Sequence, residues 1–395
     1  MEHALQYGLS EEQLMFRDMV HRLADERIAA RAADIDATGE FPWDIVDLFR
    51  ENGLIGVGIP EEYGGGGADL LTSCLAIEEV ARVCATSSLI IAAQHLGAMP
   101  ILIAGSASQK QQFLPPIASG EHLAAFALTE PHAGSDAGGT RTRAVKEGDH
   151  YRLSGTKVFI TNGGLAKTVV VFAATDPSKG IKGISAFIVD SDSPGFNIGR
   201  IEDKMGIRGS QTAQLLFDGV KVPAAQRLGA EGEGFTIAMR TLDRTRPGIA
   251  AQALGIAQGA LEASVQHLSS RQQFGRPLID MQALQFMLAD MQTQIEASRQ
   301  LLYRAAEVVE TAGFEAQASA EVTRHSAMAK LMCSDTAMKV TTDAVQLLGG
   351  YGYVRDYPVE RMMRDAKITQ IYEGTNQIQR LVIFRNMMAE RHRRT

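Results

Sequence analysis

The spacing of apolar residues changes twice along the chain, near residue 121 and again near residue 233. Before residue 121, apolar side chains recur at the spacing of amphipathic helices. One such helix follows the sequence Ser10 to Gln13, whose capping-box spacing predicts a helix start. Its apolar positions are Leu14, Val20, Leu23 and Ile28. The pattern predicts a helical N-terminal domain over residues 1–120.

Between residues 121 and 232 the apolar residues form short β-branched or alternating runs, which turn sequences separate. The predicted strands are residues 123–129, 151–154, 157–161, 169–175, 184–190, 196–200 and 213–217. No helical segment lies between these strands, and this argues against a doubly wound parallel sheet. We therefore predict a middle β domain over residues 121–232 that is an antiparallel sandwich or barrel.

Helical spacing returns at about residue 233 and continues almost to the end of the chain. The predicted helices are residues 235–270, 280–312 and 315–348, and a last helix after Gln377. Four long consecutive helices are typical of a bundle. The predicted fold class is therefore α+β, mostly α, with a helical N-terminal domain, a middle β domain and a C-terminal four-helix bundle over residues 233–395.

Composition narrows the classes of protein that fit this plan. Of the 395 residues, 45% are hydrophobic and 22% are charged, as in globular domains that bury a core. A formal net charge of −7 argues against a nucleic-acid binder, because such proteins carry basic surfaces. The three cysteines have no CxxC spacing, which argues against a disulfide framework or zinc site and fits a reducing compartment.

The N-terminal residues lack the pattern of a secretory or transit segment, so we expect a cytoplasmic protein. The longest apolar stretch, residues 88–105, contains Gln94, His95, Gly97 and Pro100. Because polar and helix-breaking residues interrupt this stretch, it predicts a pair of buried helices and no membrane insertion.

Two segments in the β region end a strand in a turn and carry candidate chemistry. The first runs from Phe126 to Asp136 and offers hydroxyl and backbone N–H groups that can hold a phosphate edge. The second runs from Phe159 to Gly164 and places an aromatic ring near the hydroxyl of Thr161. Each segment alone is equally well explained by a core phenylalanine and an ordinary hairpin turn. Together they favour a pocket for an aromatic cofactor.

Three segments in the C-terminal region also carry candidate chemistry. The arginines of Asp243 to Pro247 can meet an acyl or phosphate group, although they would equally suit a solvated helix face. The glycines of Gln346 to Tyr353 allow a ligand close to the backbone, but they follow a helix and form no dinucleotide fingerprint. Glu373 and Gly374 lie where the helical pattern breaks. This carboxylate either projects into a cleft or lies on the surface before a helix-capping glycine.

Several catalytic motifs are absent from the sequence. There is no Gly-x-Ser-x-Gly nucleophile elbow, and the predicted bundle has no Glu-x-x-His pair of the di-iron proteins. No group of His, Cys and Asp residues has the spacing of metal ligands. We therefore expect no metal site.

The motifs, taken in order, resemble those of the acyl-CoA dehydrogenases, flavoproteins of fatty-acid and branched-chain amino-acid oxidation. The segments that carry the resemblance are Ala127 to Pro131, Ala133 to Asp136, Phe159 to Gly164, Gln346 to Gly352 with Asp356, Arg361 and Asp365, and Tyr372 to Thr375. They span essentially the whole chain. The resemblance implies the same three-part fold, FAD as cofactor, an acyl-CoA substrate and a homotetramer built as a dimer of dimers.

The resemblance also implies a mechanism. Glu373 would take the α-proton of the acyl-CoA thioester while the β-hydrogen passes as hydride to flavin N5, giving a trans-2-enoyl-CoA. The backbone N–H of Glu373 and a ribityl hydroxyl would hydrogen-bond the thioester carbonyl, which stabilises the developing enolate. Burial beside the flavin should raise the pKa of Glu373. Electrons would then pass to an electron-transfer flavoprotein.

Carried over position by position, the resemblance assigns further residues. FAD would be contacted by Phe126, Leu128, Thr129, Ser135, Phe159, Thr161, Thr375 and Gln377. The FAD of a neighbouring subunit would be reached by Arg271, Phe274, Gln282, Gln346 and Gly350. The acyl-CoA would be contacted by Ser135, Asp243, Arg246 and Gly374. If the contacts to the FAD of a neighbouring subunit are right, FAD binding requires an oligomer.

Two features place the chain within the family. Many members carry Trp where this chain has Phe159, which would alter the edge of the flavin site. Some branches carry their base near position 245, but this chain has Thr245 there and Glu373 at the other position. The arrangement therefore resembles the short- and medium-chain type.

Two alternative functions remain at this stage. The first is an acyl-CoA oxidase that uses O2, although such oxidases usually have a longer chain. The second is a catalytically idle scaffold that binds CoA or flavin. Residues 90–97 are expected to form the end of the acyl pocket, but the sequence does not fix the acyl chain. His95 is either a polar residue of this pocket or a satisfied core histidine.

Overall fold

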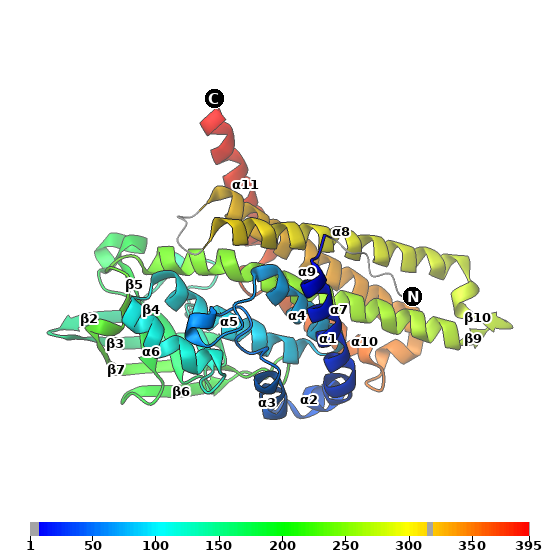
Figure 1. Cartoon of the computed structure of the whole chain (residues 1–395), viewed down its shortest axis with the longest axis horizontal. Helices are drawn as coiled ribbons and strands as arrows, with labels where there is room; N and C mark the ends of the chain where they lie inside the picture. Colours follow the sequence, from blue (N-terminus) through cyan, green and yellow to red (C-terminus); the bar gives the residue numbers. More distant parts are fainter. Residues whose placement is uncertain (1–7, 314–318, 395) are drawn as a thin grey trace.

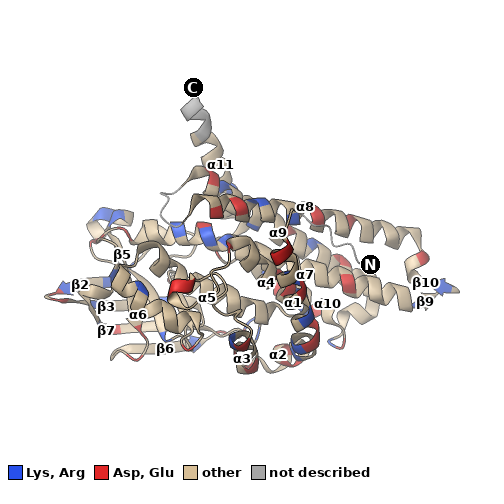
Figure 2. Ribbon diagram, viewed as in Figure 1, with Lys and Arg blue, Asp and Glu red and all other residues tan. Residues whose placement is uncertain are grey.

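The computed structural model describes residues 8–313 and 319–394 of the chain. A β-sheet lies at one end of an elongated molecule, and long helices run from it to the other end (Figure 1). The predicted fold class is confirmed, because the described chain is mostly helical and its strands gather in the middle region. Residues of both charge signs are spread over the helices and the sheet (Figure 2).

The N-terminal region is helical, as predicted. Its α-helices in the described part of the chain are α1 (Glu11–Leu23), α2 (Ala32–Thr38), α3 (Trp43–Glu51), α4 (Leu70–Val83), α5 (Ala85–Ala104) and α6 (Ala107–Ala118). The capping box at the start of α1 is confirmed. The Ser10 hydroxyl accepts the backbone N–H of Gln13 at 3.1 Å, and the Gln13 side chain accepts the N–H of Ser10 at 3.0 Å.

Helix α5 corrects one prediction. The apolar stretch over residues 88–105 belongs to one continuous helix with Pro100 inside it, whereas a pair of helices was expected. Proline removes one backbone hydrogen bond, and burial among other elements offsets this loss. By length and composition α5 is able to cross a membrane, but 78% of its most apolar window is buried inside the protein. It is therefore a core helix of this fold.

The middle region forms one eight-stranded sheet. Its strands are β1 (Ala124–Ala127), β2 (Arg143–Glu147), β3 (His150–Thr161), β4 (Thr168–Ala174), β5 (Ile184–Asp190), β6 (Phe196–Ile201), β7 (Thr212–Pro223) and β8 (Arg227–Leu228). The order is β6-β7-β3-β2-β4-β5-β8, and β1 pairs with β4. β2 was not predicted, because only one of its five residues is buried.

The sheet is mixed, which corrects the expectation of purely antiparallel pairing. β1 runs parallel to β4, from Ala124 opposite Thr168 to Ala127 opposite Val171. β1 follows helix α6 and is not joined to β4 by a hairpin, so no tight turn forces an antiparallel direction. The other extended pairings, such as β4 with β5 and β3 with β7, are antiparallel.

The two faces of β4 belong to different hydrophobic clusters. Val170 and Phe172 pack with Met99 of α5, Ile117 of α6 and Ile237 of the long helix α7 (Gly234–Ser270). Val169, Val171 and Ala173 point the other way and pack with side chains of the sheet itself, including Tyr151, Phe187 and Leu215. One face of the sheet is therefore covered by helices, and the other encloses its own apolar interior, as in a sandwich or barrel.

The C-terminal region contains the four predicted long helices. They are α7 (Gly234–Ser270), α8 (Gln282–Ala312), α9 (Ala320–Leu348) and α11 (Asn376–Arg394). Residues 315–318 of the predicted third helix lie outside the described residues. A short hairpin of β9 (Gln272–Gln273) and β10 (Arg276–Pro277) joins α7 to α8 at the end of the molecule farthest from the sheet (Figure 1).

One further helix, α10 (Pro358–Thr369), was not predicted. Its apolar residues Val359, Met362, Met363 and Ala366 recur at helical spacing, so the sequence carried a signal for this helix that the prediction did not use. Its Arg364 pairs with Asp36 of α2 at 2.6 Å, and its Asp365 accepts the backbone N–H of Ile207 at 2.5 Å. α10 therefore ties the N-terminal and middle regions to the bundle.

Candidate active site

Glu373 lies in the turn that joins α10 to α11. α10 ends at Thr369 and α11 begins at Asn376, so the predicted break in the helical pattern is confirmed. The backbone of Glu373 is left-handed, with φ of +51°, and Gly374 follows with φ of +93°. A left-handed glutamate costs about 1–3 kcal/mol, which the surrounding structure must offset. Gly374 stands beyond the end of α10 and does not cap it, so the alternative of a surface glutamate before a capping glycine is wrong.

The carboxyl group of Glu373 faces the interior. Its side chain is half-buried, and Oε2 accepts a hydrogen bond from the hydroxyl of Thr245 on α7 at 2.9 Å. Burial raises the pKa of this carboxyl to about 7, although Thr245, Arg246 and Lys330 favour the ionised form. A carboxyl with this pKa can both accept and release a proton near neutral pH.

The backbone around Glu373 is held by its carbonyl groups. The Glu373 carbonyl accepts hydrogen bonds from Arg246 Nε at 3.3 Å and Gln379 Nε2 at 3.2 Å. The Gly374 carbonyl accepts from Lys330 Nζ at 2.8 Å and from Gln379 Nε2 at 2.9 Å. Among the described residues the N–H of Glu373 has no partner. The turn therefore offers a fixed carboxyl and a free N–H donor on the same residue.

Asp243 and Arg246 form an ion pair on α7, one turn apart, with 2.8 Å between Oδ1 and Nη1. Both are buried, with exposed fractions of 6% and 4%, so the alternative of a solvated helix face is wrong. Burial raises the pKa of Asp243, although Arg246 and the Thr323 hydroxyl favour its ionised form. The pair supports the Glu373 turn, because Arg246 also donates to the Glu373 carbonyl.

The two strand-to-turn segments of the middle region are brought together. The N–H of Val158 on β3 donates to the carbonyl of Thr129, which follows β1, at 2.9 Å. Next to Val158, a register shift in β3 leaves Phe159 with φ of +58° and a ring that is 64% exposed. Phe126 instead packs on Phe172, with 4.9 Å between ring centroids. Phe159 is therefore not a core residue, and its exposed ring belongs to the residue after the one that bonds to Thr129.

A buried ion pair anchors the first of these segments. Lys157 of β3 donates to Glu130 Oε1 at 2.7 Å and to the Leu128 carbonyl at 2.8 Å. Glu130 also accepts the N–H groups of Arg141 and Thr142. Burial lowers the pKa of Lys157 to about 8, and the carboxylate of Glu130 opposes this change. The pair holds the loop after β1 against β3.

A buried glutamine lies on α7 two turns beyond Thr245. Gln252 is fully buried, and its Nε2 donates to the Ala85 carbonyl at 2.9 Å and to Ser88 Oγ at 3.2 Å. Its Oε1 accepts the hydroxyl of Tyr372, the residue before Glu373. These bonds link α7, the start of α5 and the Glu373 turn.

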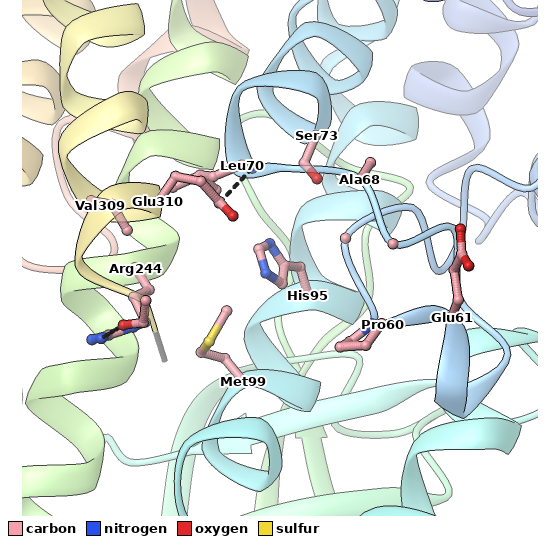
Figure 3. A pocket seen from close by; sticks show the side chains of 13 residues that line it. Pro60, Glu61, Ala68, Leu70, Ser73, His95, Met99, Arg244, Val309 and Glu310 are labelled. Carbon is pink, nitrogen blue, oxygen red and sulfur yellow. Dashed lines mark hydrogen bonds between the residues drawn. The ribbon is translucent and has the colours of Figure 1, made fainter. Parts of the chain in front are cut away.

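A cavity of about 310 Å³ lies between the loop before α4, helices α4 and α5, α7 and the end of α8 (Figure 3). It reaches α7 at Arg244, the residue before Thr245. His95 points into it, and the described residues give its imidazole no hydrogen-bond partner (Figure 3). Burial lowers the pKa of His95 to about 4, so the ring is neutral at pH 7. The structure therefore favours the pocket interpretation of His95 over a satisfied core histidine.

Comparison with known families decides the identity of the fold and its chemistry. Models of the acyl-CoA dehydrogenase N-terminal, middle and C-terminal domains match residues 10–121, 125–220 and 232–388. The chain belongs to the acyl-CoA dehydrogenase family. Members of this family are FAD flavoproteins, so the protein is an FAD-dependent oxidoreductase that dehydrogenates acyl-CoA.

Similar proteins match along almost their whole length. The short-chain specific acyl-CoA dehydrogenase of Clostridium acetobutylicum is 49% identical over 380 residues, 96% of this chain and 98% of that protein. Butyryl-CoA dehydrogenase from Megasphaera elsdenii superposes with a TM-score of 0.92 at 46% identity, covering 98% of this chain and 100% of the other. A chain from a structure of the electron transferring flavoprotein of Acidaminococcus fermentans gives 0.92 at 50% identity, covering 96% and 98%.

The residues around Phe159 fit the FAD of an acyl-CoA dehydrogenase. The exposed ring of Phe159 follows Val158, whose N–H bonds to the Thr129 carbonyl, and half-buried Thr161 ends the same strand. This gives a planar apolar surface with hydroxyl groups nearby, as an isoalloxazine ring requires. The residues that would hold FAD here are Phe126, Leu128, Thr129, Ser135, Phe159 and Thr161.

The remaining predicted FAD contacts are not brought to this surface. Arg271, Phe274, Gln282, Gln346 and Gly350 are exposed at the β9–β10 end of the molecule, opposite the sheet (Figure 1). The guanidinium of Arg271 lies 5.2 Å from the ring centroid of Tyr351, so the segment that follows α9 lies beside the start of the hairpin. We call these five predicted contacts the Arg271 group. A single subunit of the acyl-CoA dehydrogenase therefore presents two separated halves of the predicted FAD site. Thr375 and Gln377 lie beside the Glu373 turn, at the start of α11.

Sequence reasoning missed several residues that position the site. Thr245 was noted as part of the Asp243 to Pro247 segment but not as a partner of Glu373, and Lys330, Gln379 and Lys157 were not singled out. A lysine or glutamine inside a helix or strand is ordinarily a surface residue. No local signal marks these side chains, because their partners lie on other elements.

Proposed function

We propose that Glu373 is the general base that removes the α-proton of an acyl-CoA thioester, giving a trans-2-enoyl-CoA. The observation that carries this proposal is a half-buried carboxyl with a pKa of about 7, beside its own unpartnered N–H. When bound, FAD accepts the hydride that leaves the β-carbon. The chain's own residues position the substrate and handle the proton.

The free N–H of Glu373 supports this role. An α C–H next to a thioester is a weak acid, and it becomes removable when the developing charge on the carbonyl oxygen is stabilised. The N–H belongs to the same residue as the base, so it can hold the carbonyl while the carboxylate reaches the α-carbon. Arg246, Lys330 and Gln379 fix the neighbouring carbonyls, so the turn needs no rearrangement during the reaction.

Thr245 supports the proton transfer. Its hydroxyl donates to Oε2 of Glu373 when the carboxyl is ionised, and it has the Thr241 carbonyl at 3.2 Å as a second acceptor. When Glu373 has taken the proton, the hydroxyl can turn to Thr241 and accept from the carboxylic acid. Both protonation states of the base therefore keep a partner.

Gln252 supports a short acyl group. It lies seven residues after Thr245 on the same face of α7, about 10 Å further along the helix axis. Its amide is fully buried and bonded to Tyr372, Ser88 and Ala85. If the acyl chain runs along α7 from Glu373, a chain long enough to reach Gln252 would have to break these bonds. The relatives named for short-chain and butyryl-CoA substrates agree with this proposal.

The oligomer and the electron acceptor belong to the same proposal. We propose a homotetramer in which the Arg271 group of one subunit completes the FAD site of its neighbour. Large exposed apolar side chains on the hairpin, α8 and α11 support association: Phe274, Phe286, Leu381, Phe384 and Met387. The similar chain in the Acidaminococcus fermentans structure supports an electron-transfer flavoprotein as acceptor.

The test is anaerobic bleaching of the bound flavin by acyl-CoAs of increasing chain length. We expect fast reduction by short acyl-CoAs. Absence of reduction with every acyl-CoA would favour the idle scaffold, and fast reoxidation in air would favour the oxidase. Glu373→Gln should keep flavin and bind substrate but lose about 10²–10⁴-fold in reduction rate. Near-normal reduction by this variant would overturn the assignment of the base.

A further inference from the structure

The cavity between α4, α5, α7 and the end of α8 is separate from the Glu373 turn. Its lining residue on α7 is Arg244, whereas Thr245 and Arg246 bond to Glu373. Successive residues of an α-helix are about 100° apart around its axis, so Arg244 and Arg246 point in nearly opposite directions. Neither Glu373 nor Phe159 lines the cavity. The cavity is therefore distinct from the base and from the surface that fits FAD.

The interior of the cavity carries an imidazole and a hydroxyl. Both ring nitrogens of His95 lack a partner among the described residues, and the neutral ring can donate with one and accept with the other (Figure 3). Ser73 donates to the Asp69 carbonyl at 3.1 Å and can still accept. Gly58 keeps this space open, because a Cβ there would lie 2.8 Å from Ser73 Oγ and 3.7 Å from His95 Nε2. The interior therefore suits a ligand hydroxyl, which both donates and accepts.

The rest of the lining is apolar inside and acidic at the opening. Leu70, Met99 and Val309 are buried and form an apolar wall. Glu310 of α8 lines the cavity but is exposed, so its carboxylate stands where the cavity meets solvent. Its Oε2 accepts the backbone N–H of Leu70 at 3.0 Å, which fixes the carboxylate at the opening.

The charges that line the cavity favour a cation at this opening. Glu61 and Glu310 are its two carboxylates, and Arg244 is the one cation among the described lining residues. The guanidinium of Arg244 points away from His95 and donates to the Gly313 carbonyl (Figure 3). Arg244 is therefore engaged by the protein itself, and Glu310 can pair with the ammonium group of a ligand.

We propose that this cavity binds a small aliphatic amino alcohol, with its ammonium group at Glu310 in the opening and its hydroxyl at His95 inside. The apolar chain between these two ends lies against Met99 and Val309. The cavity volume of about 310 Å³ is at the lower end of the range of small-molecule sites, about 300–1,000 Å³, and so fits a ligand of few carbon atoms. The proposal does not depend on the role of Glu373.

The test is isothermal titration calorimetry of the flavin-loaded enzyme with aminobutanol at pH 7. Butylamine lacks the hydroxyl, butanol lacks the ammonium group, and hydroxybutyrate carries the opposite charge. Glu310→Gln removes the charge but keeps an oxygen for the Leu70 N–H, and His95→Phe keeps a ring without its nitrogens. Glu307→Gln is the matched control, because Glu307 is an exposed glutamate on the same helix that pairs with Arg304.

We expect aminobutanol to bind more tightly than the other three compounds. Glu310→Gln should lose about fivefold in affinity for both aminobutanol and butylamine, the upper end for an exposed ion pair. His95→Phe should lose about fivefold for aminobutanol, because a neutral hydrogen bond is lost, and should bind butylamine as the wild type does. Glu307→Gln should match the wild type with every compound.

Two results would overturn the proposal. The first is no binding of aminobutanol by the wild type, and the second is wild-type affinity in Glu310→Gln. If His95→Phe fails to fold, the wild-type affinities for aminobutanol and butylamine decide, since equal values would show that the hydroxyl has no partner inside.

A competition experiment separates this cavity from the acyl pocket. The titration with aminobutanol is repeated under anaerobic conditions on enzyme saturated with a short acyl-CoA. An unchanged affinity is expected, and loss of binding would place the cavity in the acyl pocket and refute the proposal. Failure of every acyl-CoA to reduce the flavin would instead refute the proposed function, and it would leave the binding of aminobutanol unchanged.

Discussion

The hydrogen bond from Thr245 to Glu373 gives a quantitative prediction. Thr245→Val keeps the shape of the side chain but removes the donor that faces Oε2 at 2.9 Å. Because this bond stabilises the ionised carboxyl, its loss should raise the pKa of Glu373. The base is active only when ionised, so the rate of flavin reduction should rise with pH in both enzymes. In Thr245→Val the midpoint of this rise should lie at a higher pH than in the wild type.

The magnitude follows from the structure. A hydrogen bond to a charged group contributes about 1.5–3 kcal/mol, which corresponds to about one to two pH units at 1.36 kcal/mol per unit. The Thr245 hydroxyl also has the Thr241 carbonyl as an acceptor at 3.2 Å, so part of this energy is regained when Glu373 is neutral. We therefore expect the lower value, a displacement of about one pH unit from the wild-type value near 7.

The assay is the rate of anaerobic flavin reduction at saturating short acyl-CoA, measured by stopped flow between pH 5.5 and 9.5. At pH 7 the ionised fraction of Glu373 should fall from about one half to about one tenth, which gives about a fivefold slower reduction. At high pH the two enzymes should converge, since both carboxyls are then ionised.

Thr241→Val is the matched control for this variant. Thr241 lies one turn earlier on α7, is fully buried, and its hydroxyl has no partner among the described residues. The same substitution there should leave the midpoint unchanged. A Thr245→Val profile that superimposes on the wild type would refute the reasoning, as would an equal displacement in Thr241→Val.

Two further predictions concern the cofactor site. Arg271→Ala should retain less flavin after gel filtration than the wild type, and should lose its flavin at a lower guanidinium concentration. Arg276→Ala, on the same hairpin, should retain flavin as the wild type does. Normal flavin retention by Arg271→Ala would contradict an FAD site shared between subunits. Lys157→Met should lower the free energy of unfolding by about 3–5 kcal/mol, because Glu130 is left buried without its cation. A loss below about 1 kcal/mol in denaturant titrations would show that this ion pair does not anchor the loop after β1.

Much of the fold could be predicted from local pattern. The capping box at Ser10, the helix through Pro247 and the break before Asn376 follow from interactions between residues close in sequence. The parallel pairing of β1 and the existence of β2 could not be predicted in this way, whereas the apolar spacing of α10 was present in the sequence and was overlooked. Strand direction depends on which distant segment lies alongside, and β2 has too few buried residues to show a period.

The candidate site shows the same division. The sequence by itself determined the family and was enough to propose Glu373 as the base and the two cofactor segments, because these depend on residue identities and on their order. Only the tertiary structure decided what surrounds that base. Thr245, Arg246 and Lys330 are 128, 127 and 43 residues from Glu373 in sequence, and they meet it only because α7 and α9 pack beside one turn. Desolvation and hydrogen bonding depend on this packing, so the pKa of the base is a property of the fold and not of the motif.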